Sequence, residues 1–198
     1  MQFTRASDEQ LDGAAELLSR AFHEDPGALL LYPMVRGRPA ALKRGFARLL
    51  STPGLCIVIG TVPGSREPMA CAVWLPPGSR TMSLGGMVAS MSSLLRHPRA
   101  TLRMARAAPS LQRLQERCSP AEAWSLITLG VDPTVRGTGA GSALLQQGLR
   151  EVVPSNRSCY LETLNPNNVR WFARAGFQVA GQIIPAGSTT TIAMVREP

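Results

Sequence analysis

A glycine-rich segment directly after an apolar stretch holds the residue types with the clearest chemistry in this chain. It reads Leu-Gly-Val-Asp-Pro-Thr-Val-Arg-Gly-Thr-Gly-Ala-Gly at positions 129–141. Residues 123–131 are typical of a strand and residues 142–151 of a helix. At such a junction, the unpaired amides and the dipole of the helix start can bind phosphate oxygens. Three glycines let this backbone come close to a diphosphate: Gly137, Gly139 and Gly141.

Two other kinds of phosphate-binding loop do not fit this segment. A nucleoside-triphosphate loop ends in Gly-Lys-Ser/Thr, which binds the terminal phosphate and magnesium, and that ending is missing here. A dinucleotide-binding turn follows the first strand of its unit, whereas this turn lies near residue 140. A glycine-rich connection without a ligand remains the structural alternative.

Residues 159–177 form a second motif, which predicts a strand, a polar turn and a short helix ending at Gly176. With this motif the sequence resembles the GNAT acetyltransferase superfamily. The RxxGxG of Arg136, Gly139 and Gly141 is similar to its pyrophosphate loop. The second GNAT signature, commonly NxxAIxxYxxxGF, is similar to Asn165, Asn168, Val169, Trp171, Gly176 and Phe177. Residues 121–196 resemble most closely the branch that contains puromycin N-acetyltransferase.

The resemblance implies an α+β fold in three layers, the GNAT acyl-CoA N-acyltransferase fold. A central mixed, mostly antiparallel sheet is flanked by helices, with a helical insert between the third and fourth strands. We expect one domain over residues 1–198, with the insert at about 80–118 and the acyl-CoA-binding core at about 121–196. The chain pattern before the insert predicts strands at 3–5, 55–61 and 69–75 and helices at 8–22 and 40–50. The sequence of the insert predicts helices that are interrupted at Pro98 and again at Pro109.

The resemblance also implies an activity: transfer of an acetyl group from acetyl-CoA to a primary amine of a small molecule, directly within a ternary complex. Val131 N–H is then the candidate donor to the oxyanion. The cofactor contacts implied are Leu129, Gly130, Val131, Arg136, Gly137, Thr138, Gly139, Ala140, Gly141, Ser142, Asn165, Asn168 and Phe172. Phe172 departs from the family, which usually has a tyrosine there, proposed to protonate the leaving thiolate. A phenyl ring has no proton to give, so another donor or solvent serves, or catalysis is weak.

The base that accepts the amine proton has two candidates. Glu162 lies two residues after Tyr160 on a predicted strand, so both side chains share one side of the sheet, where burial would raise the pKa of the carboxyl. A structural carboxylate is the equal alternative for Glu162. Glu122 is the second candidate, acting through water. Tyr160 and Tyr32 are the only phenols that could replace the missing acid. The expected acceptor-binding residues are Phe22, Asp25 and Tyr32.

The amino-acid composition limits which kinds of protein this chain can be. Apolar residues make up 44% of 198 residues, enough for the core of one domain, and no apolar run approaches the ~18 residues of a membrane span. We therefore expect a cytoplasmic protein without a membrane partner. The four cysteines are far apart in sequence and are accompanied by two histidines, so no disulfide framework or metal site is predicted.

Positive charge is concentrated in the predicted insert. The stretch from Arg80 to Arg117 contains seven arginines and one glutamate, so it carries most of the net charge of +8. This stretch lacks aromatic residues, which argues against a nucleic-acid surface. Its charge nevertheless leaves open a second reading, acetylation of protein N-termini or of an RNA-linked amine. Phe172 leaves open a third, an acyl-CoA-binding sensor or scaffold with weak or no catalysis. Among relatives of this kind a homodimer is common.

Overall fold

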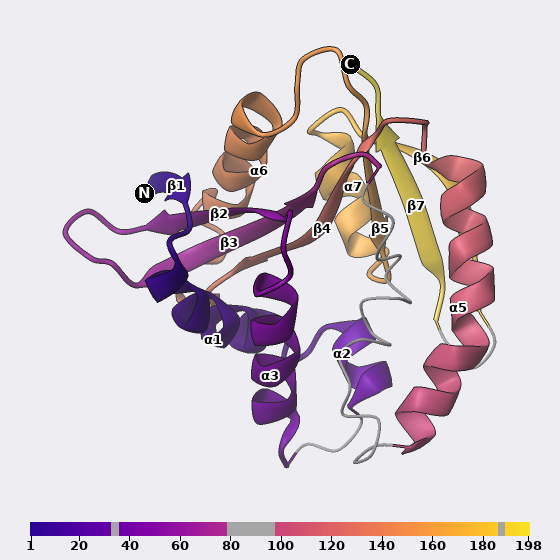
Figure 1. The fold of residues 1–198 in the computed structure, drawn as a ribbon, viewed down its shortest axis with the longest axis horizontal. Coiled ribbons are helices and arrows are strands. Elements are labelled where there is room, and N and C mark those ends of the chain that lie inside the picture. Colours follow the sequence, from indigo (N-terminus) through magenta and orange to yellow (C-terminus); the bar gives the residue numbers. More distant parts are fainter. Residues whose placement is uncertain (33–35, 79–97, 186–188) are drawn as a thin grey trace.

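A seven-stranded sheet forms the centre of the computed structural model, which describes residues 1–32, 36–78, 98–185 and 189–198 (Figure 1). The strand order is β1-β2-β3-β4-β5-β7-β6, and all neighbours are antiparallel except β4 and β5. The strands are β1 (Gln2–Arg5), β2 (Cys56–Thr61), β3 (Pro68–Leu75), β4 (Trp124–Val131), β5 (Cys159–Thr163), β6 (Gln178–Ile183) and β7 (Thr191–Arg196). This sheet confirms the predicted mixed, mostly antiparallel architecture.

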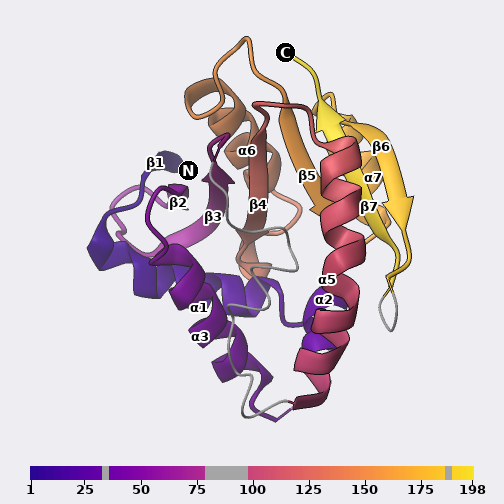
Figure 2. The same cartoon turned by 45° about the vertical axis from the view of Figure 1, so that its right-hand side comes forward.

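Helices cover both faces of the sheet (Figures 1 and 2). They are α1 (Leu11–Ala21), α2 (Pro26–Leu31), α3 (Arg38–Leu50), α5 (Pro98–Cys118), α6 (Ala140–Glu151) and α7 (Asn167–Ala173). On one face, α1 and α3 bury their apolar sides against Ile59, Cys71 and Val73. Leu114 of α5 packs on Tyr160 and Val195 further along that face. On the other face, α6 and α7 pack against Trp74, Leu126 and Leu161. The three-layer arrangement follows.

Two helices differ from the sequence prediction. Helix α1 ends near the predicted residue 22, but α2 was not predicted; it begins at Pro26 because the Asp25 side chain accepts the Gly27 amide and Pro26 occupies the first turn. Helix α5 begins at Pro98 but runs through Pro109 without a break. Burial of Ala107, Leu111 and Leu114 against the sheet holds it together there. The part of the predicted insert at 79–97 lies outside the described residues.

Strands β4 and β5 separate along their length. Their parallel pairing covers only three residues of β4 and ends at Leu126 opposite Leu161, although β4 continues to Val131. On its other side β4 stays paired with β3 up to Val131, after a bulge in which Trp74 faces Leu126 and Val73 faces Thr128. Among the described strands, the second half of β4 therefore has a neighbour on the β3 side and none on the β5 side. None of the described helices is both long and apolar enough to cross a membrane.

Candidate active site

A cleft of about 730 Å³ lies where β4 separates from β5. The end of α1, the glycine-rich loop, the start of α6 and the β5–α7 connection contribute its walls. The lining residues are Ala21, Phe22, Glu24, Asp25, Leu129, Gly130, Val131, Val135, Arg136, Gly137, Gly139, Ala140, Gly141, Ser142, Asn165, Asn168, Trp171, Phe172 and Arg174. Most of the residues predicted to contact the cofactor therefore meet in one cleft, with Phe22 and Asp25 beside them.

The glycine-rich loop has the backbone geometry that an anion site requires. Gly137 and Gly139 adopt left-handed φ angles of 79° and 86°, and Gly139 is the N-cap of α6. Gly141 lies in the first helical turn without a positive φ, and it lines the cleft. A Cβ there would make ordinary contacts, at 3.6 Å, with Trp171 and Val131.

The amides of the first turn of α6 have no intrahelical acceptor. The first α-helical bond is that of Ala143 N–H to Gly139 C=O, so the amides of residues 140–142 come before it. Earlier in the loop, the amides of Arg136 and Thr138 make only long bonds, of 3.4 and 3.5 Å. The helix start therefore presents N–H groups and the positive end of its dipole to the cleft.

The main chain of β4 faces the gap between β4 and β5. Asp132 N–H bonds Met69 C=O at 2.8 Å, which makes these two a hydrogen-bonded pair of the β3–β4 ladder. Pairs alternate in an antiparallel ladder, so the amides and carbonyls of Val131 and Leu129 point away from β3. They point to the side on which β5 has separated. A thioester arm lying in the gap could therefore bond to both residues.

The β5–α7 connection is held by hydrogen bonds on Thr163. Its Oγ1 accepts from the Asn165 amide at 3.2 Å and from Asn168 Nδ2 at 3.4 Å. Trp171 Nε1 donates to Ser142 Oγ at 3.1 Å and joins α7 to the loop helix. Phe172 is buried, with its ring edge-on to Trp171 and to Phe177. Phe172 therefore gives the cleft an apolar contact without a hydroxyl group.

Glu162 and Tyr160 form a hydrogen-bonded pair on β5, as their spacing predicts. Tyr160 Oη donates to Glu162 Oε1 at 2.7 Å. Glu162 Oε2 is buried and has no partner within the described part of the chain. Burial raises the pKa of Glu162 to about 7, against a lowering by the bond from Tyr160. Burial, together with the Glu162 charge, also raises the pKa of Tyr160. Tyr160 is paired with Ser125 of β4, and Glu162 lies one residue beyond the last β4–β5 pair; neither residue lines the cleft.

Besides Tyr160, Glu162 and Thr138, which are not among the lining residues, two predicted residues lie further from the cleft. Glu122 is exposed at the opposite end of β4 from Val131, with a φ of 62° and an ion pair to Arg157 at 3.4 Å. Tyr32 is 5% exposed and packs in the cluster of α1 and α3, where its carbonyl accepts from Arg38. Neither residue lines the cleft. The structure therefore does not bring Glu122 or Tyr32 together with the other predicted site residues.

The turn after α1 forms the wall of the cleft that holds two of the three predicted acceptor-binding residues. Phe22, Glu24 and Asp25 line it, and burial raises the pKa of Asp25 although the Gly27 and Ala28 amides lower it. Five lining residues were not predicted from the sequence: Ala21, Glu24, Val135, Trp171 and Arg174. Val135 and Trp171 had a signal, their places in the glycine-rich segment and in the second motif. Within the described ranges, no three His, Cys, Asp or Glu side chains could together hold a metal ion.

Comparisons with known proteins agree with this geometry. Residues 103–177 match the family model described as Acetyltransferase (GNAT) family. A chain from Corynebacterium glutamicum, described as histone acetyltransferase HPA2 and related acetyltransferase, is 21% identical, with a TM-score of 0.71 over 100% of this chain and 96% of that one. Arylalkylamine N-acetyltransferase 2 from Aedes aegypti is 12% identical, with a TM-score of 0.67 over 99% and 98%. A chain of the NatC complex bound to Gag peptide and CoA is 13% identical, with a TM-score of 0.54 over 100% of this chain and 99% of that one.

The fold is that of the GNAT acyl-CoA N-acyltransferases, and the family match covers the loop and the β5–α7 motif. Residues 103–177 are thus similar to the GNAT acetyltransferases, a family that uses acetyl-CoA as its cosubstrate. The residues present fit that molecule: free helix-start amides suit its diphosphate, and the exposed main chain of β4 suits its amide-bearing arm. These matches do not distinguish the puromycin N-acetyltransferase branch from other GNAT branches.

Proposed function

We propose that this enzyme transfers the acetyl group of acetyl-CoA directly to a primary amine of a small molecule, within a ternary complex. The observation that carries the proposal is the separation of β4 from β5. It leaves the main chain of Leu129 and Val131 facing a gap that opens toward the glycine-rich loop, and Glu162, with one buried and unpartnered oxygen, follows the last β4–β5 pair on β5. Acetyl-CoA and an amine acceptor can therefore meet without a covalent enzyme intermediate.

In the proposed reaction, the amides of the loop and of α6 hold the diphosphate, and the main chain of Leu129 and Val131 holds the acyl arm. Val131 N–H donates to the carbonyl oxygen as negative charge develops on it. Ionised Glu162 accepts a proton from the amine, and its raised pKa places this exchange near neutral pH. The thiolate then leaves, and it is protonated by a group other than Phe172. Glu122 and Tyr32 have no part in this scheme.

Thiol release from acetyl-CoA across a panel of acceptors tests the proposal. Arylalkylamines belong in the panel because a structural neighbour is named for them, and amine antibiotics belong because residues 121–196 resemble the puromycin N-acetyltransferase branch. Peptide N-termini and aminoacylated RNA form separate arms. We expect release with at least one small amine. Release with the peptides or RNA alone would contradict the small-molecule assignment.

The cofactor assignment has a test that needs no acceptor. Gly139 and Gly64 have similar φ angles of 86° and 82°, and a Cβ at either would meet no atom within 4 Å. Gly139→Trp fills the cofactor loop, whereas Gly64→Trp introduces the same strain in the turn between β2 and β3. Acetyl-CoA at 100 times its Kd stabilises by about 2.7 kcal/mol, which raises Tm by roughly 5 to 10 °C.

We expect that rise in the parent protein and in Gly64→Trp, and none in Gly139→Trp. Equal rises in the two tryptophan variants would remove the loop from the cofactor site.

A second candidate, an acyl-CoA-binding sensor, is favoured by Phe172 alone. It predicts that acetyl-CoA raises Tm while no amine releases thiol, and that Phe172→Tyr does not change this. Thiol release by the parent protein with any amine excludes it.

A further inference from the structure

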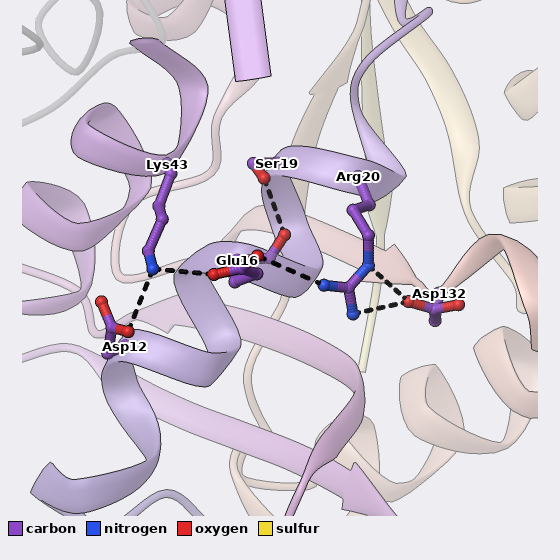
Figure 3. A network of polar contacts seen from close by, with 6 residues as sticks. All are labelled: Asp12, Glu16, Ser19, Arg20, Lys43 and Asp132. Carbon is purple, nitrogen blue, oxygen red and sulfur yellow. Dashed lines mark hydrogen bonds and ion pairs between the residues drawn. The ribbon is translucent and has the colours of Figure 1, made fainter. Parts of the chain in front are cut away.

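Helix α1 is tied to the cofactor loop by a buried carboxylate that the proposed reaction does not use (Figure 3). Asp132 follows β4 directly and is 4% exposed. Its Oδ2 accepts from Arg20 Nε at 2.9 Å and from Arg20 Nη2 at 2.8 Å. Its Oδ1 accepts from the amide and the hydroxyl of Thr134, at 3.0 and 2.7 Å. One side chain thus organises the first turn of the loop and holds the last turn of α1.

Two further contacts keep α1 and the loop in one arrangement. Arg136 Nη2 donates to the Ala21 carbonyl at 2.6 Å, from the loop to the end of α1. Gly130 of β4 lies so close to α1 that a Cβ there would be 2.8 Å from Leu18 and 3.1 Å from Ala21. The residues directly after this junction, Phe22 to Asp25, include the acceptor side of the cleft. A shift of the loop is therefore passed to the acceptor side through α1.

The Arg20–Asp132 pair differs from the rest of its network. Arg20 also lies 3.9 Å from Glu16, and Glu16 pairs with Lys43 at 2.7 Å (Figure 3), but neither of these pairs includes a buried side chain such as that of Asp132. Exposed pairs of this kind contribute little. Burial alone would raise the pKa of Asp132, yet the bonds from Thr134 and Arg20 lower it, so the carboxylate is ionised at neutral pH. Removing the charge of Asp132 should therefore weaken its bonds to Arg20 of α1 more than its bonds to Thr134.

We propose that Arg20 and Asp132 are positioning residues that couple the two substrate sites, so that coenzyme A bound at the loop fixes the acceptor side of the cleft. The inference rests on the proposed function, since it requires that the loop bind coenzyme A. By linkage, an acceptor then tightens coenzyme A binding by the same factor. Neither residue contacts the reacting atoms.

Amide hydrogen exchange with and without coenzyme A tests the coupling without an acceptor. The His23 amide bonds to the Arg20 carbonyl and the Asp25 amide to the Phe22 carbonyl, so both report on the end of α1. Arg20→Met removes the guanidinium. Asp132→Asn keeps an oxygen acceptor for Thr134 and loses the charge that attracts Arg20. Lys43→Met is the matched control, because it breaks only the exposed end of the network.

We expect coenzyme A to slow exchange at His23 and Asp25 at least about fivefold in the parent protein and in Lys43→Met. In Arg20→Met and Asp132→Asn the slowing falls below about twofold, while calorimetry shows coenzyme A affinity within about threefold of the parent. Equal slowing in the parent and in either of these variants overturns the inference and leaves the proposed function intact. No binding of coenzyme A to the parent overturns both.

Discussion

Glu162 is the residue whose environment ties the proposed chemistry most directly to pH. Its carboxyl has a pKa of about 7, because burial raises it more than the bond from Tyr160 lowers it. Only the ionised form can accept a proton, so kcat/KM should rise with pH through about 7. Glu162→Gln should lower kcat by about 10²- to 10⁴-fold. A pH profile of both proteins checks this, and an unchanged rate in Glu162→Gln would assign the carboxylate a structural role.

The two tyrosines separate a residue that tunes the base from one that only packs. Tyr160 donates to Glu162, which lowers the pKa of that carboxyl, so Tyr160→Phe should move the rising limb of the pH profile to higher pH. Tyr32 lies in the cluster of α1 and α3, and Tyr32→Phe should leave the limb in place. A limb that moves in neither variant, or equally in both, would show that the bond from Tyr160 does not tune the base.

The elements closest to the site were the most predictable from sequence. The apolar run of β4, the glycines that follow it and the Asn-Pro turn of α7 each carry local signals. The start of α2 was missed because Pro26 and Gly27 signal a break as well as a first turn, and only the bond from Gly27 to Asp25 distinguishes them. The continuity of α5 at Pro109 depends on burial against the sheet, which no local pattern contains.

Gly148 shows how closely α6 must approach the sheet to place its first turn at the cleft. A Cβ at Gly148 would overlap the indole of Trp74, which is fully buried. Gly148→Ala should therefore destabilise the protein by about 1 to 3 kcal/mol through overpacking. Gly141→Ala, at the other end of the same helix, meets only ordinary contacts at 3.6 Å and should be neutral or stabilising, because alanine favours helix by about 1 kcal/mol. Urea unfolding without cofactor compares the two. A larger loss at Gly141 would contradict the packing argument.

At the scale of the whole molecule, the cleft could be predicted only in part. The loop and the β5–α7 motif lie close together in sequence, and a resemblance sufficed to pair them. The wall proposed to hold the acceptor comes from the turn after α1, more than a hundred residues earlier, and Glu24 has no local signal of its own. The gap that exposes Leu129 and Val131 depends on where β4 and β5 stop pairing, a property of register rather than composition. The same reasoning explains why Glu122 was misplaced: it is near the gap in sequence and at the far end of the strand in space.

The net charge of +8 makes a prediction about how coenzyme A reaches the cleft. Its phosphates are anionic, and the Debye length falls from about 30 Å at 0.01 M to about 8 Å at 0.15 M ionic strength. The association rate should therefore fall about tenfold over that range in stopped-flow measurements, whereas acetyl-pantetheine, which lacks the phosphates, should show little change. Arg106, Arg113 and Arg117 are exposed on α5 and outside the cleft, so changing all three to Gln should make the salt dependence shallower with the dissociation rate unchanged. Equal salt dependence for both ligands would mean that the charge of the molecule does not guide the cofactor.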